Sequence, residues 1–157
     1  MTLHTSGDIA DLSDTQRAQI SDRWNTHHAV RYLGASVDLT DPDVVRLTVD
    51  PIESHHRGGL GTDAVNGVVM AGVFDLTIGL VAHLAALQRR VGTVQLNIQY
   101  IRPVHGDRFE VEGRLVRCGR KLIFGTADLL NQDKTLCARC DGMAAIVGET
   151  PSELIAL

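Results

Sequence analysis

The chain has 157 residues, of which 44% are hydrophobic and 22% are charged, and its formal net charge at pH 7 is −4. This length is typical of one domain with a single core, and the composition is that of an ordinary globular protein. The acidic balance leaves no basic stripe to neutralise phosphates, which argues against a nucleic-acid partner. The 3 cysteines indicate reduced thiols, and the polar first residues lack the basic and apolar regions of a signal peptide. We therefore expect a cytoplasmic protein that does not enter a membrane.

The N-terminal part of the chain predicts a loose start followed by a capped helix. Residues 1–12 have no periodicity and are expected to precede a single domain that spans residues 13–157. Ser13 and Gln16 have the spacing of a capping box, in which each side chain bonds to the other residue's backbone N–H. They predict a helix that begins here and ends near His28.

Two short strands and a long loop are predicted next. Residues 31–40 and 43–50 alternate well enough for two strands, with an Asp-Pro-Asp turn between them. Residues 51–64, PIESHHRGGLGTDA, form a Gly-rich segment that is long for a loop in a compact domain. That length indicates a functional segment rather than a simple connection.

The stretch VNGVVMAGVFDLTIGLVAHL at residues 65–84 predicts a central helix of about five turns, over about 66–86, that is apolar on every side. Such a helix belongs inside a bilayer or a protein core. A mid-membrane Asp costs about 2.5–3.5 kcal/mol, and the helix carries Asp75 at its middle with no basic flank. We therefore expect protein to wrap the helix and Asp75 to be buried, which would make this carboxylate the mark of a functional site.

After this helix the periodicity changes to that of strands. The strand at 93–101 is predicted to place alternate residues on opposite faces, namely Val94, Leu96, Ile98 and Tyr100 against Thr93, Gln95, Asn97 and Gln99. Further strands at 108–117, 121–130 and 134–147 are separated by short turns. The sequence thus predicts an α+β domain in which an antiparallel meander over about 92–147 wraps the central helix.

The helix also predicts a site that needs two chains. Asn66 stands at the N-cap position, which leaves Gly67 and Val68 with backbone N–H groups that could stabilise an oxygen gaining negative charge. Asp75 follows nine residues after Asn66, about 13 Å along the helix axis and about 180° around it. The two features of one chain cannot reach the same small group. A second helix packed antiparallel in a twofold homodimer would bring them together, and a tetramer built as a dimer of dimers stays open.

The pattern NG-(7)-D on the helix, followed by TVQLNIQYIRP, GD, R-x-GRK and CAR, resembles the hotdog-fold acyl-CoA thioesterases of the PaaI type over about residues 30–147. The resemblance implies a hotdog fold and hydrolysis of an acyl or aryl thioester to a carboxylic acid and free coenzyme A, with no cofactor. It implies Asp75 as general base or nucleophile and the Gly67 N–H as donor to the thioester carbonyl from the partner subunit. It also implies that Thr93 helps to hold the attacking water.

Other positions follow from the same resemblance. It implies that the coenzyme A groove is lined by Tyr100, Arg117, Gly119, Arg120 and Lys121.

The chain departs from the family pattern where the helix begins. The family has His-Gly-Gly where this chain has Asn66, Gly67 and Val68. Asn can cap a helix and donate to a carbonyl, so we expect the polarising function to survive, and we assign Val68 to substrate binding. Some relatives carry an Asn six residues before that His, and this chain has Leu60 at that position. Asn66 is the candidate to take over the role of that Asn.

Two other functions remain open at this stage. A hotdog enoyl-CoA hydratase or dehydratase would need a His facing an acid, but no His lies on the helix before His83. A non-catalytic acyl-CoA-binding hotdog protein would keep the groove without the chemistry. The turn that carries Arg117, Arg120 and Lys121, here called the basic turn, could be a solvated hairpin without a ligand. Asp75 could be a structural carboxylate.

No metal site is expected. The adjacent histidines at 27–28 and 55–56 would point to opposite faces of an extended segment. Cys137 and Cys140 have CxxC form, but positions three apart on a strand also face opposite ways.

Overall fold

The computed structural model describes residues 11–86 and 89–148, so most of the predicted loose N-terminus lies outside the described residues. The helices are α1 (Asp14–Asn25), α2 (His28–Tyr32) and α3 (Gly67–Ala85), with a short 3₁₀ helix η2 (Ser54–His56). The long strands are β5 (Arg90–Tyr100), β6 (Phe109–Cys118), β7 (Leu122–Asn131) and β8 (Leu136–Gly148). The short strands are β1 (Ala35–Asp38), β2 (Val45–Val49), β3 (Arg57–Gly59) and β4 (Ala64–Val65).

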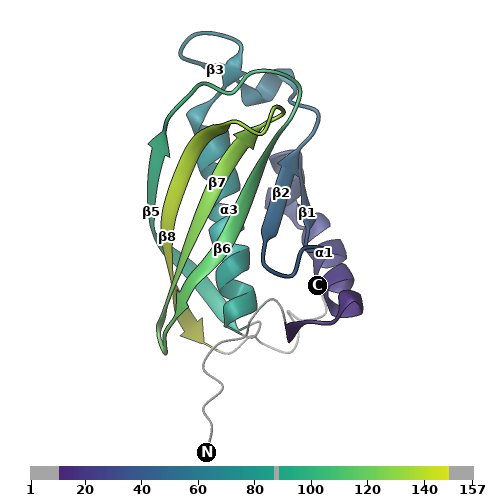
Figure 1. Ribbon diagram of the computed structural model, residues 1–157, viewed down its shortest axis with the longest axis vertical. Helices are drawn as coiled ribbons and strands as arrows, with labels where there is room; N and C mark the ends of the chain where they lie inside the picture. The colour runs from purple at the N-terminus through teal and green to yellow at the C-terminus, as the bar shows by residue number, and fades with distance from the viewer. Residues whose placement is uncertain (1–10, 87–88, 149–157) are drawn as a thin grey trace, which may run out of the picture.

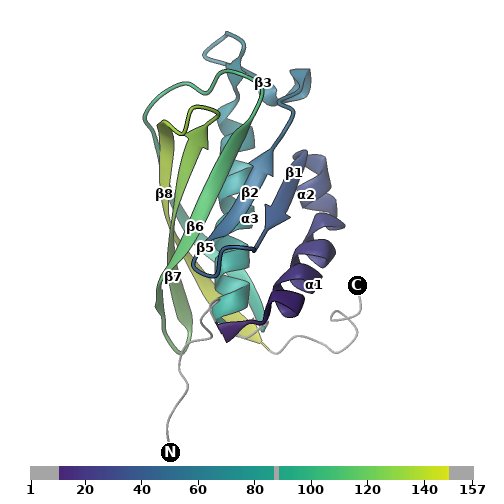
Figure 2. The same ribbon diagram turned by 45° about the vertical axis from the view of Figure 1, so that its right-hand side comes forward.

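One antiparallel sheet of six strands, in the order β1-β2-β6-β7-β8-β5, curves around α3 (Figure 1). Helices α1 and α2 lie beside β1, as the turned view shows (Figure 2). The prediction of a long antiparallel sheet wrapped around a central apolar helix is confirmed. Strands β3 and β4 form a separate pair near the N-terminal end of α3.

The first helix begins as the sequence predicts. The Ser13 side chain accepts the Gln16 N–H, and the Gln16 side chain accepts the Ser13 N–H, which completes the capping box. Helix α1 ends at Asn25, and the last two residues of α2, Arg31 and Tyr32, are ones that the sequence assigned to the start of a strand. The Asn25 amide binds both the N–H and the C=O of Val37, at 2.6 and 3.2 Å, so it satisfies backbone groups of β1.

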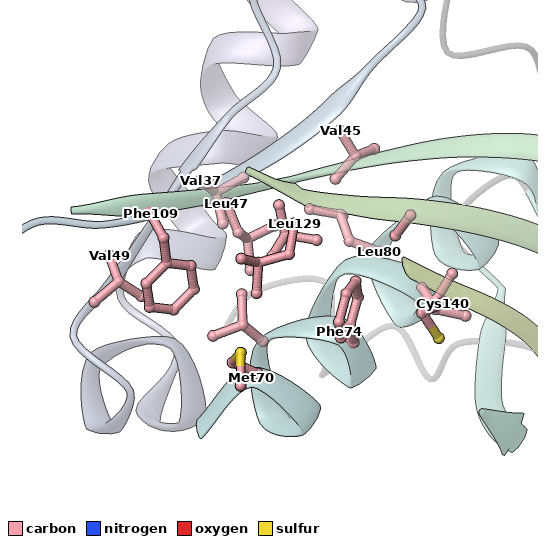
Figure 3. Close-up of a cluster of buried hydrophobic side chains, with 14 of the residues drawn as sticks. Val37, Val45, Leu47, Val49, Met70, Phe74, Leu80, Phe109, Leu129 and Cys140 are labelled. Carbon is pink, nitrogen blue, oxygen red and sulfur yellow. The ribbon is translucent and has the colours of Figure 1, made fainter. Parts of the chain in front are cut away.

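The core lies between α3 and the concave face of the sheet. Eleven residues of α3 are buried, and Met70, Phe74 and Leu80 point toward Leu47 and Leu129 of the sheet (Figure 3). By length and composition α3 could span a membrane, yet 61% of its most apolar 18-residue window is buried inside the protein. Removing this apolar surface from water is the main contribution to stability.

Glycines on the sheet allow this close packing. A Cβ on Gly113 would lie 2.5 Å from Cγ2 of Thr77, and one on Gly142 would lie 2.7 Å from Cγ2 of Ile78. Both distances are shorter than carbon atoms tolerate. The strands can therefore approach the helix only because these positions lack side chains.

Strand β5 differs from its prediction in two ways. The meander contains only β6, β7 and β8, because β5 pairs with β8 and lies at the edge of the sheet. A bulge between Thr93 and Gln95 also reverses the predicted faces at Thr93 and Val94, whereas Leu96, Ile98 and Tyr100 face the helix as predicted. Thr93 pairs with the buried Ala144 and faces the helix, whereas Val94 is 54% exposed. The extra residue interrupts the alternation on which the prediction relied.

The segment predicted as the loop 51–64 contains η2, β3 and β4, and it holds the N-terminus of α3 in place. The Ile52 N–H donates to the Asp107 carbonyl at 2.6 Å, and the Val65 N–H donates to the Val104 carbonyl at 2.9 Å. The Arg57 guanidinium donates to the carbonyls of Ile52 and Gly106. These bonds join the segment before α3 to the segment after β5.

Candidate active site

The N-terminus of α3 is capped by Asn66, as the sequence predicts. Its Oδ1 accepts the Val68 N–H at 2.9 Å, and its backbone C=O accepts the Val69 N–H at 3.0 Å. Neither the Gly67 N–H nor the Val68 N–H has a helical partner, as predicted, but the cap engages that of Val68. Gly67 is the first helical residue and has no helical acceptor, so its N–H is the donor that stays available for a ligand.

Tyr100, at the end of β5, contacts this first turn directly. Its hydroxyl donates to the Gly67 carbonyl at 3.0 Å, and its ring lies 3.6 Å from the place a Gly67 Cβ would occupy. Burial raises the pKa of Tyr100 above its usual value of 10.0, which keeps the phenol protonated as a donor. Tyr100 thus fixes the backbone beside the candidate oxyanion donor.

An apolar cavity of about 450 Å³ lies beside Gly67. Its lining includes Leu60 from the β3–β4 turn, Met70 from α3 and Ile101 just after β5. Sequence analysis missed this cavity, because the three residues come from segments that only the fold brings together. Gly67 is therefore part of the wall of an apolar space suited to a small molecule.

Asp75 lies on α3 but not in the core, so the prediction that it is buried is wrong for the single chain. Its side chain is exposed, and it forms no hydrogen bond or ion pair with the described residues. It belongs to a narrow stripe along α3 that the sheet does not cover, together with Val68, Ala71 and Gly79, whereas Gly72 faces Leu33. An exposed stripe of small and apolar residues is a surface that another molecule can cover.

The basic turn, between β6 and β7, lies at the opposite end of the domain from the N-terminus of α3 (Figure 1). Arg117, Arg120 and Lys121 are exposed there, and the Gly119 N–H donates to the Leu122 carbonyl to close the hairpin. The Cys118 thiol donates to the Ala85 carbonyl at 3.5 Å, which fixes the turn beside the C-terminal end of α3.

The predicted site residues therefore fall into separate groups. Ala85 marks the place along α3 where the basic turn packs. It follows Gly67 by 18 residues, about 27 Å along the helix axis, and Asp75 by ten residues, about 15 Å. Tyr100 lies with Gly67 and not with the basic turn, although the resemblance assigned both to one groove. Thr93 is half-buried on the inner face of β5, and its hydroxyl forms no hydrogen bond with the described residues.

His56 holds the segment before α3 and was not identified from the sequence. It is 1% exposed, its Nδ1 accepts the Glu53 N–H at 2.9 Å, and its carbonyl accepts the Asn66 N–H at 2.8 Å. Its Nε2 is buried without a partner among the described residues. The prediction that His55 and His56 face opposite ways is wrong, because residues 54–56 form a 3₁₀ turn in which the two rings lie 3.9 Å apart.

The cysteines are all thiols. Cys137 and Cys140 are both buried, against the prediction of opposite faces, because the register shifts at Cys137. Burial raises the pKa of Cys140 to about 11, so this thiol stays protonated. In residues 11–86 and 89–148 no three potential ligands lie close enough together to hold a metal ion.

A six-stranded antiparallel sheet curved around one helix is a hotdog fold, and solved structures confirm it. A thioesterase from Haemophilus influenzae superposes with a TM-score of 0.73 at 16% identity, covering 87% of this chain and 93% of that one. The PaaI protein of the E. coli phenylacetic acid degradation operon gives a TM-score of 0.68 at 15% identity, covering 87% and 94%. At these identities the likeness defines the fold.

Sequence comparisons find similarity to thioesterases over part of the chain. The family model for the Thioesterase superfamily matches residues 63–138, which include Gly67, Asp75 and Tyr100. The medium/long-chain acyl-CoA thioesterase YigI of Salmonella typhimurium is 30% identical over 95 residues, covering 52% of this chain and 61% of YigI. A putative esterase of Halobacterium salinarum is 29% identical over 110 residues, covering 68% and 72%. The chain is thus similar to proteins of the Thioesterase superfamily over part of its length, and it spans only 61% of the length of YigI.

The anchoring of the α3 N-terminus by His56 predicts sensitivity to acid. Burial lowers the pKa of His56 below its usual 6.5, and the neighbouring His55 and Arg57 lower it further while Glu53 opposes them. The unfolded chain then binds the proton more readily, so the free energy of unfolding should fall as the pH drops below about 6.5. Thermal unfolding at a series of pH values should show a flatter pH dependence for His56→Asn, which cannot gain the proton.

His28, which is exposed, provides the control for this prediction. The variant His28→Asn should retain the pH dependence of the original chain. Part of the slope should also remain in His56→Asn, because burial lowers the pKa of His83 as well. If the stability of His56→Asn and that of the original chain changed equally with pH, His56 would be excluded as a cause of acid sensitivity.

Proposed function

We propose that this protein hydrolyses an acyl-CoA thioester to a carboxylic acid and free coenzyme A. One observation carries the proposal: Gly67, whose N–H has no acceptor among the described residues, lines an apolar cavity, and the same helix carries the exposed carboxylate of Asp75. These are the donor, the acyl-binding space and the base that thioester hydrolysis requires. The family match and the acyl-CoA named for the relative YigI support this substrate.

The active unit in this proposal is a homodimer with two shared sites. Within one chain the Gly67 N–H and the Asp75 carboxylate are too far apart and point in different directions. Two exposed surfaces favour a second copy as the partner. The uncovered stripe of α3 is small and apolar, and no described strand pairs with the outer edge of β5, which is 11 residues long. A long unpaired edge is a template for pairing with another chain.

In the shared site, the thioester carbonyl oxygen accepts the Gly67 N–H of one subunit, with Asn66 beside it. Asp75 of the other subunit removes a proton from a water that attacks the carbonyl carbon, and Thr93 helps to hold this water. The negative charge on the tetrahedral intermediate is stabilised at the α3 N-terminus. The carbon–sulfur bond then breaks, and the thiolate takes the proton from Asp75. Direct attack by Asp75, followed by hydrolysis of the anhydride, uses the same groups.

The phosphates of coenzyme A bind the basic turn in this proposal. That turn lies about 15 Å along α3 from Asp75 of its own chain, a separation of the order that an extended pantetheine arm covers. One subunit then supplies the acyl cavity, Val68 and Tyr100, whereas the other supplies Asp75, Arg117, Arg120 and Lys121. The protein acts in the cytoplasm, which the free thiols support, and needs no cofactor.

Replacement of Asp75 tests the role of the carboxylate. Asp75→Asn has nearly the same size and should fold and bind acyl-CoA, but it should lose at least roughly 100-fold in kcat, the lower limit for a general base. Thiol release from acyl-CoA measures this loss, and thermal unfolding shows whether the variant is folded. A stable Asp75→Asn protein with nearly full activity would refute the site assignment.

Mixed dimers test whether the site is shared. Gly67→Pro removes the N–H at the first helical position, where Pro is tolerated, and Gly67→Ala is the control that adds a Cβ but keeps the donor. Asp75→Ala and Gly67→Pro chains should each be inactive alone, but should regain part of the activity when mixed. The absence of rescue in confirmed mixed dimers would argue against a shared site.

Charge removal on the basic turn tests the phosphate contact. The double variant Arg120→Gln/Lys121→Gln should raise the KM for acyl-CoA, most strongly at low salt, and should leave kcat nearly unchanged. An acyl-pantetheine substrate without the nucleotide phosphates is the control. An equal rise in KM for that substrate would show that the turn acts in another way.

A further inference from the structure

We infer that the outer face of the sheet docks on an anionic lipid surface at the end of the domain that carries the basic turn. Four exposed apolar side chains lie there, here called the outer apolar patch: Val116 of β6, Leu122 and Phe124 of β7, and Val147 of β8. The turn between β6 and β7 and the end of β8 are at the same end of the domain (Figure 1). Docking of this kind goes beyond the proposed function, because it concerns the surface on which the protein works and not the reaction.

The outer apolar patch points away from the core. Ile123 is buried in a cluster with alanines of α3, so its neighbours Leu122 and Phe124 lie on the opposite face of β7. Ile146 packs against the same cluster, whereas the next residue, Val147, is 59% exposed. The patch therefore lies on the convex face of the sheet. It stays accessible in the proposed dimer, which would cover the uncovered stripe of α3 and the edge of β5.

Two β-bulges bring valines into the patch. The pairing of β6 with β7 skips Val116, which is 63% exposed. The pairing of β8 with β5 skips Val147. A bulge redirects a side chain, and here both side chains face water. With the two β7 residues between them, the valines form an apolar surface on three neighbouring strands, which marks an interaction site more clearly than single exposed residues do.

Cations lie on both sides of the patch. Arg117 of the basic turn pairs with Phe124 and shares its face of the sheet. Arg90, at the start of β5, pairs with Gly148 at the far side of the patch. Arg90 and the three cations of the basic turn are exposed and form no ion pair with the described residues. They are therefore able to bind anions beside the apolar side chains.

Charged side chains on the rest of the outer face neutralise one another. Arg46 lies 3.0 Å from Glu112, and Arg139 lies 2.6 Å from Asp128. Residues 113–127, in contrast, carry four cations and no carboxylate. The net charge of −4 for the whole chain therefore does not describe this end, which is locally positive.

Apolar side chains flanked by cations fit a lipid surface better than another polyanion. The cations contact lipid phosphates, while the apolar side chains enter the layer between the headgroups and the acyl chains. A protein partner would need a surface complementary to this convex face, whereas lipids rearrange around separate side chains. Such contact stays on the membrane surface and requires no spanning segment, so α3 remains in the core.

Co-sedimentation with vesicles tests lipid docking. The original chain should bind vesicles made of equal parts of phosphatidylglycerol and phosphatidylcholine, and it should bind vesicles of phosphatidylcholine alone much less. Added salt should weaken the binding to the mixed vesicles, because it screens the cations. Absence of binding to the mixed vesicles, or equal binding to both kinds, would overturn the inference.

Two double variants separate the apolar part of the surface from the basic part. Val116→Ser/Val147→Ser should weaken partitioning to the mixed vesicles roughly tenfold, because two apolar side chains no longer leave water. Arg90→Gln/Arg117→Gln should weaken it roughly 25-fold, from about fivefold for each cation near an anionic surface. Both variants should keep the melting temperature of the original chain, since all four side chains are exposed.

Helix α2 provides the matched control, because it carries the exposed Arg31 and Tyr32 and lies beside β1. Arg31→Gln/Tyr32→Ser should bind the mixed vesicles as the original chain does. Unchanged binding in both patch variants, or an equal loss in the α2 variant, would overturn the inference. Binding to poly-glutamate without binding to vesicles would also overturn it and would indicate an acidic protein as the partner.

Two further measurements separate lipid docking from the proposed function. Asp75→Asn should bind the mixed vesicles as the original chain does, because Asp75 lies outside the docking surface. Val116→Ser/Val147→Ser should leave the KM for acyl-CoA unchanged without vesicles, and a raised KM would instead assign the patch to coenzyme A. Vesicle binding without hydrolysis would support docking and refute the thioesterase, whereas hydrolysis without vesicle binding would refute docking alone.

Discussion

The packing of α3 against the concave face of the sheet is the constraint on which the rest of the structure depends. The helix is apolar around most of its circumference, so the sheet must curve around it to remove that surface from water. Gly113 and Gly142 permit the close approach, since a Cβ at either position would collide with α3. Once the helix is seated, the positions of its N-terminus and of its single uncovered stripe are fixed.

The N-terminus of α3 is held more firmly than a cap alone requires. Asn66 satisfies the next N–H groups of the helix, while its own N–H is bound by the His56 carbonyl. Tyr100 holds the Gly67 carbonyl from the opposite side. One donor, the Gly67 N–H, is left over within this network. Because its surroundings are fixed, the donor is already oriented before any substrate binds, which is the condition for effective stabilisation of developing charge.

The uncovered stripe explains how a carboxylate can belong to such an apolar helix. Burying Asp75 in the core without a partner would cost several kcal/mol. The fold avoids this cost by directing Asp75 to the surface that the sheet leaves open. The stripe and the unpaired edge of β5 are both features of one chain that a second copy could complete. The placement of Asp75 is thus consistent with a structural requirement and a functional one.

The sequence alone determined the central helix, its Asn66 cap, the long strands and the resemblance to hotdog thioesterases, because these depend on local periodicity and short motifs. It failed where one extra residue changes a pattern, as at the β5 bulge that turns Thr93 inward and Val94 outward. It also placed Asp75 in the core, because hydrophobicity does not reveal which side of a helix the sheet leaves uncovered. Only the tertiary structure brought Leu60, Met70 and Ile101 around one cavity and separated the basic turn from Gly67. Such proximities depend on how distant segments pack, which no local pattern encodes.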